Sequence, residues 1–133
     1  MNIGQAAAAT GMTAKSIRYY ESVGLIAAAD RRTNNYRDYD TRAIAELRFI
    51  QRARSLGFPV KDVADLLALW RDRSRASAQV HAMAAAHVDA IERKVAELQT
   101  MKGALQDLLR RCHNDGRPAC PILDDLAQAG RLP

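Results

Sequence analysis

Cysteines and long apolar runs are both scarce in this chain of 133 residues. It has only two cysteines, Cys112 and Cys120, which argues against a small secreted domain held together by disulfides. No stretch approaches the roughly 20 apolar residues that a transmembrane helix needs, and no basic segment precedes an apolar one at the N-terminus, as a signal peptide requires. We therefore expect a cytoplasmic protein without membrane contact, whose thiols stay reduced and serve metal binding or redox chemistry.

Enzyme motifs are absent as well. The sequence contains no nucleophile and base pair, phosphate-binding loop or paired-carboxylate motif, so we do not expect an enzyme. Aromatic residues are few, and all seven lie between positions 19 and 70, which predicts that the compact core belongs to the first half.

Charge divides the chain at a similar place. Residues 1–75 hold 13 Lys and Arg against 8 Asp and Glu, whereas residues 76–133 hold 7 of each. The net charge of +5 therefore lies on the N-terminal part. Such a balance suits a polyanion such as DNA, although an ordinary basic surface would give the same numbers.

The longest regular pattern runs from Ser77 to Arg111. Its apolar residues recur at an average step of 3.5, the coiled-coil repeat, and no proline interrupts them. A helix of this length spans roughly 50 Å, and the short tail is too small to cover its apolar stripe. We expect it to form a coiled-coil homodimer; a helix folding onto its own domain is the alternative. The stripe consists of Val80, Ala84, Val88, Ile91, Val95, Leu98, Met101, Leu105 and Leu108.

Two short helices at the N-terminus have helix-turn-helix spacing. An alanine-rich helix from Ile3 to Thr10 ends at Gly11, and a second helix follows with Thr13 as its N-cap and Gly24 as its stop.

The second helix has two faces. Its inward-facing residues are expected to be Ile17, Tyr20 and Val23. Its outward residues are then Lys15, Arg18 and Tyr19, which are of the types that reach phosphates and base edges from the major groove. An amphipathic helix with a solvated basic face is the alternative.

Residues 27–39 show no helical periodicity and include the turn-forming pair Asn34-Asn35. They predict a small β-hairpin, or wing, with Tyr36 and Tyr39 near its return strand. The wing would carry three arginines beside the second helix, which is the expected recognition helix: Arg31, Arg32 and Arg37.

Two further helices complete the N-terminal part. One is expected from Asp40 or Thr41 through Leu56, and the other from about Lys61 to Trp70. Lys61, at the start of the fourth helix, is a candidate phosphate contact. The polar segment 71–76 would link this part to the long helix.

The order of these parts resembles the MerR family of transcription regulators. The resemblance rests on residues 16–21 (Ser-Ile-Arg-Tyr-Tyr-Glu), 24–26 (Gly-Leu-Ile), 35–39 (Asn-Tyr-Arg-Asp-Tyr) and 56–58 (Leu-Gly-Phe). Two cysteines separated by seven residues, followed by Pro-Ile, look like the copper-responsive branch, which is CueR-like and HmrR-like.

This resemblance implies a mainly α fold in three parts. They are a winged helix-turn-helix domain (1–75), a dimerisation helix forming an antiparallel coiled coil (76–111), and a metal-binding loop with a short C-terminal helix (112–133). The homodimer would repress its promoter without metal, distort the DNA when metal binds, and so let RNA polymerase transcribe copper-efflux or detoxification genes. Arg18 and Arg37 match positions that hold phosphates. The full set of expected DNA contacts is Thr13, Lys15, Ser16, Arg18, Tyr19, Tyr20, Arg31, Arg37 and Lys61.

The chemistry of the two cysteines also points to a soft ion. Two thiolates suit Cu(I), and Ag(I) and Au(I) share its preference for linear sulfur coordination. Zinc would need two more ligands, from among His81, His87, His113 and Asp115. A thiol-oxidation sensor and a metal buffer or chaperone are the alternatives. Cys120 would lie at the N-terminus of a helix from Pro121 to Leu126, where the dipole favours a thiolate.

Ser77 is the last candidate. By resemblance, it occupies the position where copper-type members have serine and divalent-ion members have cysteine. A neutral hydroxyl there adds neither ligand nor charge to a bis-thiolate Cu(I) site. The alternative is that Ser77 only caps the long helix.

Overall fold

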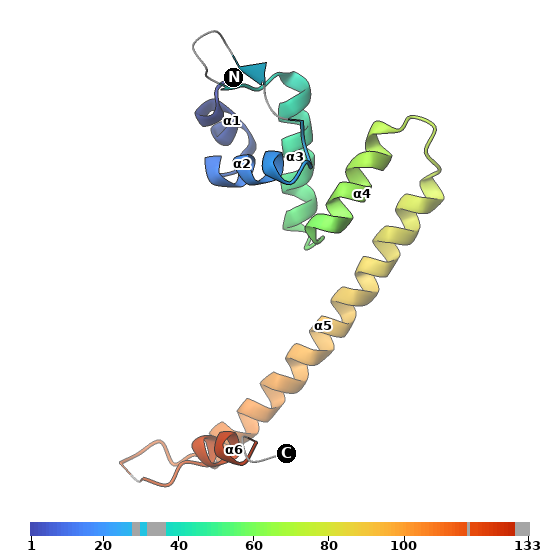
Figure 1. Ribbon diagram of the computed structural model, residues 1–133. Helices are drawn as coiled ribbons and strands as arrows, with labels where there is room; N and C mark the ends of the chain where they lie inside the picture. The colour runs from blue at the N-terminus through green and yellow to red at the C-terminus, as the bar shows by residue number, and fades with distance from the viewer. Residues whose placement is uncertain (28–29, 32–36, 117, 130–133) are drawn as a thin grey trace. The chain divides into compact units, whose positions relative to one another are not determined.

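A computed structural model describes residues 1–27, 30–31, 37–116 and 118–129 (Figure 1). The chain is mainly helical, as predicted, and it divides into two units, Met1–Ala82 and Met83–Pro133. No helix in the described part is long and apolar enough to cross a membrane. In chain order the elements are α1 (Ile3–Thr10), α2 (Ala14–Ser22), β1 (Asp30–Arg31), β2 (Arg37–Asp38), α3 (Thr41–Ser55), α4 (Val60–Arg71), α5 (Ser77–Arg111) and α6 (Pro121–Ala129).

Polar caps place the helix starts where the sequence predicted them. The Thr13 hydroxyl accepts a hydrogen bond from the Ser16 N–H at 3.1 Å, and the Asp40 carboxylate accepts one from the Ala43 N–H at 2.8 Å. Gly11, at φ 73°, ends α1 in the left-handed conformation that glycine adopts without strain. The helix-turn-helix is therefore confirmed.

Two helix ends differ from the prediction. The second helix stops at Ser22, and Val23, predicted to face inward, is 50% exposed, because the chain turns there into the left-handed Gly24. The C-terminal helix continues past the predicted Leu126 to Ala129, since the residues that follow Leu126 are good helix formers.

The predicted hairpin is present. β1 and β2 pair antiparallel, with Asp30 opposite Asp38 and Arg31 opposite Arg37. The rest of the predicted wing, residues 32–36 with its expected turn, lies outside the described residues. Tyr39, just after β2, is buried, and its hydroxyl donates to Glu21 Oε1 of α2 at 2.5 Å. This bond joins the base of the wing to the recognition helix.

The main core lies in the first unit, as the aromatic distribution predicted. Trp70 of α4 stacks on Phe49 of α3, with ring centroids 4.7 Å apart and planes 9° from parallel. Every buried apolar residue of the described chain belongs to this core except Leu108 on α5. The core residues are Ala6, Met12, Ile17, Tyr20, Leu25, Ile26, Tyr39, Ile44, Leu47, Ile50, Ala53, Val63 and Leu67.

Candidate DNA-binding face and cysteine loop

The recognition helix α2 presents a basic outer face. Ile17 is fully buried, whereas Lys15, Arg18 and Tyr19 are exposed. Neither Lys15 nor Arg18 forms an ion pair with a described residue, so both side chains are available to an external anion. The arrangement fits a helix that meets the DNA backbone and groove.

Three other predicted contacts on or beside α2 have structural roles. Thr13 and Ser16 share a hydrogen bond at 3.0 Å in addition to the N-cap bond, so both hydroxyls lie at the start of the helix. Tyr20 is 8% exposed and packs in the core. The structure places it as a packing residue, and its contact with DNA stays a prediction.

The remaining predicted contacts come from the wing and from α4. Arg31 and Arg37 are paired residues of the two-stranded sheet, but their side chains lie outside the described part. Lys61 is exposed in the first turn of α4. The N-cap residue, Pro59, supplies no side-chain hydrogen bond to this helix, and the N-terminus of a helix is a favourable place for a phosphate.

The two cysteines bracket one short loop. The Cys112 N–H donates to the carbonyls of Leu108 and Leu109 at 3.1 and 3.2 Å, so Cys112 continues the last turn of α5. The Cys120 carbonyl accepts from the Asp124 N–H at 3.0 Å, which places Cys120 at the N-cap of α6, as predicted. Both are free thiols and partly buried.

This donor set fits a soft ion of low coordination number. Cys112 and Cys120 are two soft sulfur donors at the ends of two helices, and sulfur donors of this kind favour soft ions such as Cu(I). Within the described residues, no three His, Cys, Asp or Glu side chains are grouped to hold a metal. His113 is exposed in the loop, and His81 and His87 lie on α5.

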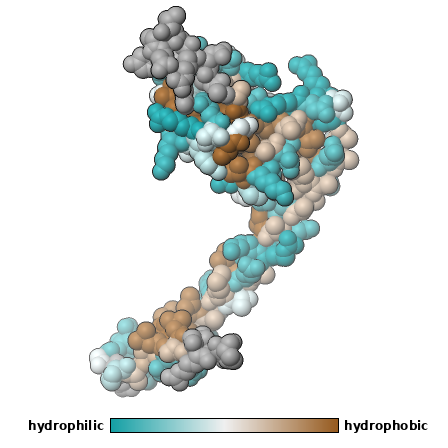
Figure 2. Space-filling view, viewed as in Figure 1, coloured by the Kyte–Doolittle hydropathy of each residue, from teal (hydrophilic) through white to brown (hydrophobic). Residues whose placement is uncertain are grey.

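The long helix α5 leaves most of its apolar stripe exposed, with Leu108 as the buried exception. Six large residues of the predicted stripe are each between 44% and 54% exposed. Hydrophobic residues accordingly reach the surface of this helix (Figure 2). The six are Val88, Ile91, Val95, Leu98, Met101 and Leu105.

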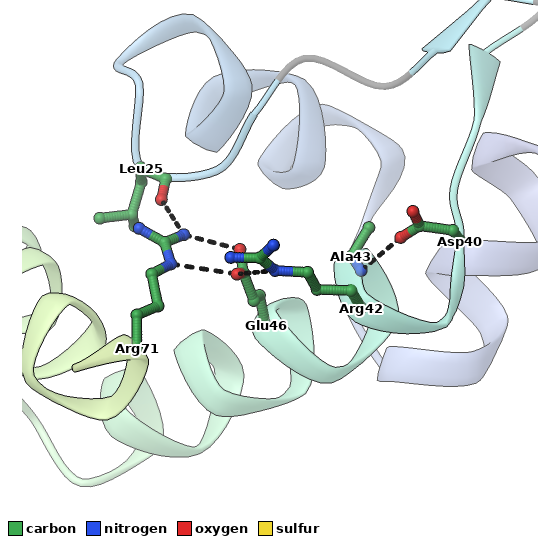
Figure 3. Close-up of polar contacts among 6 residues, drawn as sticks. All are labelled: Leu25, Asp40, Arg42, Ala43, Glu46 and Arg71. Carbon is green, nitrogen blue, oxygen red and sulfur yellow. Dashed lines mark hydrogen bonds and ion pairs between the residues drawn. The ribbon is translucent and has the colours of Figure 1, made fainter. Parts of the chain in front are cut away.

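Sequence analysis missed one buried charge, Glu46 of α3. It is 6% exposed and bonded to Arg71 at the end of α4 (Figure 3). The local signal was its spacing of four residues from Arg42, which also contacts it. Its position between the apolar residues Ile44 and Leu47 gave no warning that a distant cation neutralises it.

Comparison with known proteins places these features in a family. The family described as "MerR HTH family regulatory protein" matches residues 1–69, and the family described as "MerR, DNA binding" matches residues 44–108. The chain is 51% identical over 130 residues to the transcriptional regulator HmrR of Sinorhizobium medicae, covering 98% of this chain and 88% of that protein. It is 50% identical over 127 residues to "Heavy metal-dependent transcription regulator 2" of Rhizobium meliloti, covering 96% and 86%.

A solved structure is similar over nearly the same length. The transcription regulator PbrR691 from Ralstonia metallidurans CH34, crystallised in complex with lead(II), superposes with a TM-score of 0.81 at 30% identity, covering 95% of this chain and 98% of that one. These matches and three features of the structure point to the same family. The features are the helix-turn-helix, the wing and the long helix. The chain belongs to the MerR family of helix-turn-helix transcription regulators.

Proposed function

We propose that this protein is a metal-responsive regulator that binds promoter DNA as a homodimer and senses Cu(I), or Ag(I) or Au(I), through Cys112 and Cys120. The observation that carries the proposal is the position of the thiols, one ending α5 and one starting α6. The bound ion would supply a soft acid that both sulfurs share. The heavy metal-dependent relative and the lead(II) complex of PbrR691 support a metal as the signal.

The expected output is activation of copper-efflux or detoxification genes. α2, the wing and the start of α4 would hold the DNA backbone, and the exposed stripe of α5 would pair two copies. Metal binding at the end of α5 would change the distortion that the two helix-turn-helix domains of the dimer impose on DNA. The changed DNA shape would alter how RNA polymerase transcribes the promoter. Clamps on the backbone suit such indirect readout better than contacts to bases do.

The test is an anaerobic titration of the full-length protein, with open-complex formation at its promoter as the readout. Cu(I) should activate at concentrations where Zn(II) does not, because zinc prefers four ligands. Diamide in place of metal should not activate. Activation by diamide as strong as that by Cu(I) would favour a thiol-oxidation sensor, and Cu(I) binding without any effect on transcription would favour a metal buffer.

The basic residues of the first unit lead to a prediction about how DNA binding depends on salt concentration. Arg18→Ala and Arg37→Ala should each weaken binding to all operator variants, because a backbone contact carries no sequence information. The slope of log affinity against log salt concentration should flatten by about one unit for each phosphate that a subunit no longer neutralises. Fluorescence anisotropy across a salt series measures this slope. An unchanged slope would remove the substituted arginine from the backbone contacts.

Ser77 is expected to set which ion is sensed. It is the first residue of α5 and is exposed, and its side chain makes no hydrogen bond to any described residue. Ser77→Cys should raise the affinity for Zn(II) and weaken the preference for Cu(I), since a third thiolate suits divalent ions that accept more sulfur donors.

Competition titrations with Cu(I) and Zn(II) chelators test this role. The matched control is Ser77→Ala, which removes the hydroxyl without adding a ligand and should keep the wild-type metal preference. If Ser77→Cys also keeps that preference, Ser77 has no part in selectivity. The capping alternative has no support in the structure, because Ser77 is the first helical residue and its side chain makes no hydrogen bond to a described residue.

A further inference from the structure

A partly buried ion pair joins the last residue of α4 to the core of the first unit. Arg71 donates from Nε to Glu46 Oε1 at 3.0 Å and from Nη2 to Glu46 Oε2 at 2.6 Å (Figure 3). Glu46 is buried, and this two-pronged contact with a guanidinium is the strong form of the interaction. The hydrogen bond from Arg71 holds the pKa of the Glu46 carboxyl below its usual value.

The same arginine reaches the segment that follows the recognition helix. Arg71 Nη2 also donates to the carbonyl of Leu25 at 3.2 Å, three residues after α2 ends (Figure 3). One side chain at the C-terminal end of α4 therefore contacts both α3 and the exit of α2. Arg42 Nε donates to Glu46 Oε1 at 3.3 Å and completes the network.

The linker that begins at the next residue is itself a hydrogen-bonded turn. The Asp72 carboxylate accepts from the Ser74 N–H at 2.9 Å and from the Ser74 hydroxyl at 2.7 Å. The Arg75 N–H and its Nη1 donate to the Asp72 carbonyl at 3.3 and 3.1 Å. α5 begins at Ser77. An Asp side chain bonded to backbone two residues ahead fixes the local direction of the chain.

These contacts form one joint, which we define as Leu25, Glu46, Arg71, Asp72 and Ser74. It runs from the end of the recognition helix to the residues before α5, with a partly buried ion pair at one end and a hydrogen-bonded turn at the other. In a dimer, a stiff joint at this place would limit the distance and the angle between the two recognition helices. Half-site spacing on DNA is fixed by that geometry.

We propose that this joint determines which operator spacing the dimer accepts, with Arg71 and Asp72 as positioning residues that do not touch DNA. The inference rests on the homodimeric DNA binding proposed above and not on copper. One inserted base pair moves the second half-site by about 3.4 Å and rotates it by about 35°. A stiff dimer resists both changes, whereas a loosened joint absorbs them.

The experiment uses the full-length protein without metal and a palindromic duplex that the wild type selects from a random library. Further duplexes carry one or two base pairs inserted or deleted at the centre. Anisotropy gives the affinity for each, and the readout is the ratio between the selected and the altered spacings. Sedimentation of the protein–DNA complex gives the number of chains bound.

Wild type should discriminate against altered spacing by about tenfold or more, a change on the scale of one mismatched base pair. Arg71→Gln should bring that ratio close to one. The affinity for the duplex with the selected spacing should change less than the ratio does. Arg71→Lys keeps the positive charge but cannot donate to both oxygens of Glu46 as a guanidinium does, so its ratio should lie between those of the wild type and Arg71→Gln. Asp72→Ala should have the same direction of effect, and because Asp72 is exposed, this variant leaves the core intact. Arg73→Gln removes an equal charge from an arginine that has no ion pair among described residues, and it should behave as wild type.

A purely structural role for the joint predicts something else. Destabilised heads would weaken binding to every duplex by a common factor and leave the ratio unchanged, which would overturn the inference. A wild-type dimer that is indifferent to spacing would also overturn it. Binding of a single chain per duplex would instead overturn the homodimer, and the joint would have no spacing to set.

Discussion

Replacing either Cys112 or Cys120 by serine should abolish metal-induced transcription while leaving operator affinity within about threefold of wild type, as expected for independent sites. Serine offers a hard hydroxyl oxygen in place of a soft sulfur, so neither variant retains two soft ligands. The thiols belong to the unit Met83–Pro133, whereas every predicted DNA contact belongs to Met1–Ala82. In vitro transcription with Cu(I), paired with anisotropy on the operator, measures both quantities.

The pattern among the cysteine variants is as informative as the loss itself. If both sulfurs hold one ion, the double variant should respond no worse than either single variant, because each substitution already removes the site. The control is His113→Ala, which changes the exposed loop residue next to Cys112 and should keep the response. A single cysteine variant with half of the wild-type activation would contradict a shared site.

Local rules predicted most of the fold. Thr13 and Asp40 cap their helices, and Gly11 ends α1, because capping depends on residues within one turn. The one incorrect inward residue, Val23, lies where periodicity continued one residue beyond the helix. The periodicity of a helix does not show at which residue its last turn ends and the loop begins.

Contacts between distant residues were beyond such rules. Arg71 and Glu46 are separated by 25 residues, and Tyr39 and Glu21 by 18. Each pair depends on how whole helices pack, which periodicity does not encode. For the cysteines, local signals predicted the common loop and the place of Cys120 at the start of a helix, and the structure confirms both. Their role at a metal remains a prediction from their chemistry and from the family.

The second large effect is expected on the apolar stripe of α5. Leu98→Asp should shift the protein from dimer to monomer and remove high-affinity operator binding. A buried leucine contributes about 1.5–3 kcal/mol, and a homodimer loses two of them. The dissociation constant of the dimer should therefore rise by about a hundredfold or more, at about 1.4 kcal/mol per factor of ten. Sedimentation equilibrium measures the dimer, and anisotropy measures the operator affinity.

Ala96→Asp is the matched control, because residue 96 lies about 200° away from residue 98 around a helix that turns 100° per residue. Both substitutions introduce the same charge and a residue of low helix propensity into the middle of α5, so their effects on the helix itself should be similar. Only the change at Leu98 puts a carboxylate into the stripe that is half exposed in the single chain. A dimer that survives Leu98→Asp but dissociates with Ala96→Asp would show that the chains pair through the opposite face of the helix.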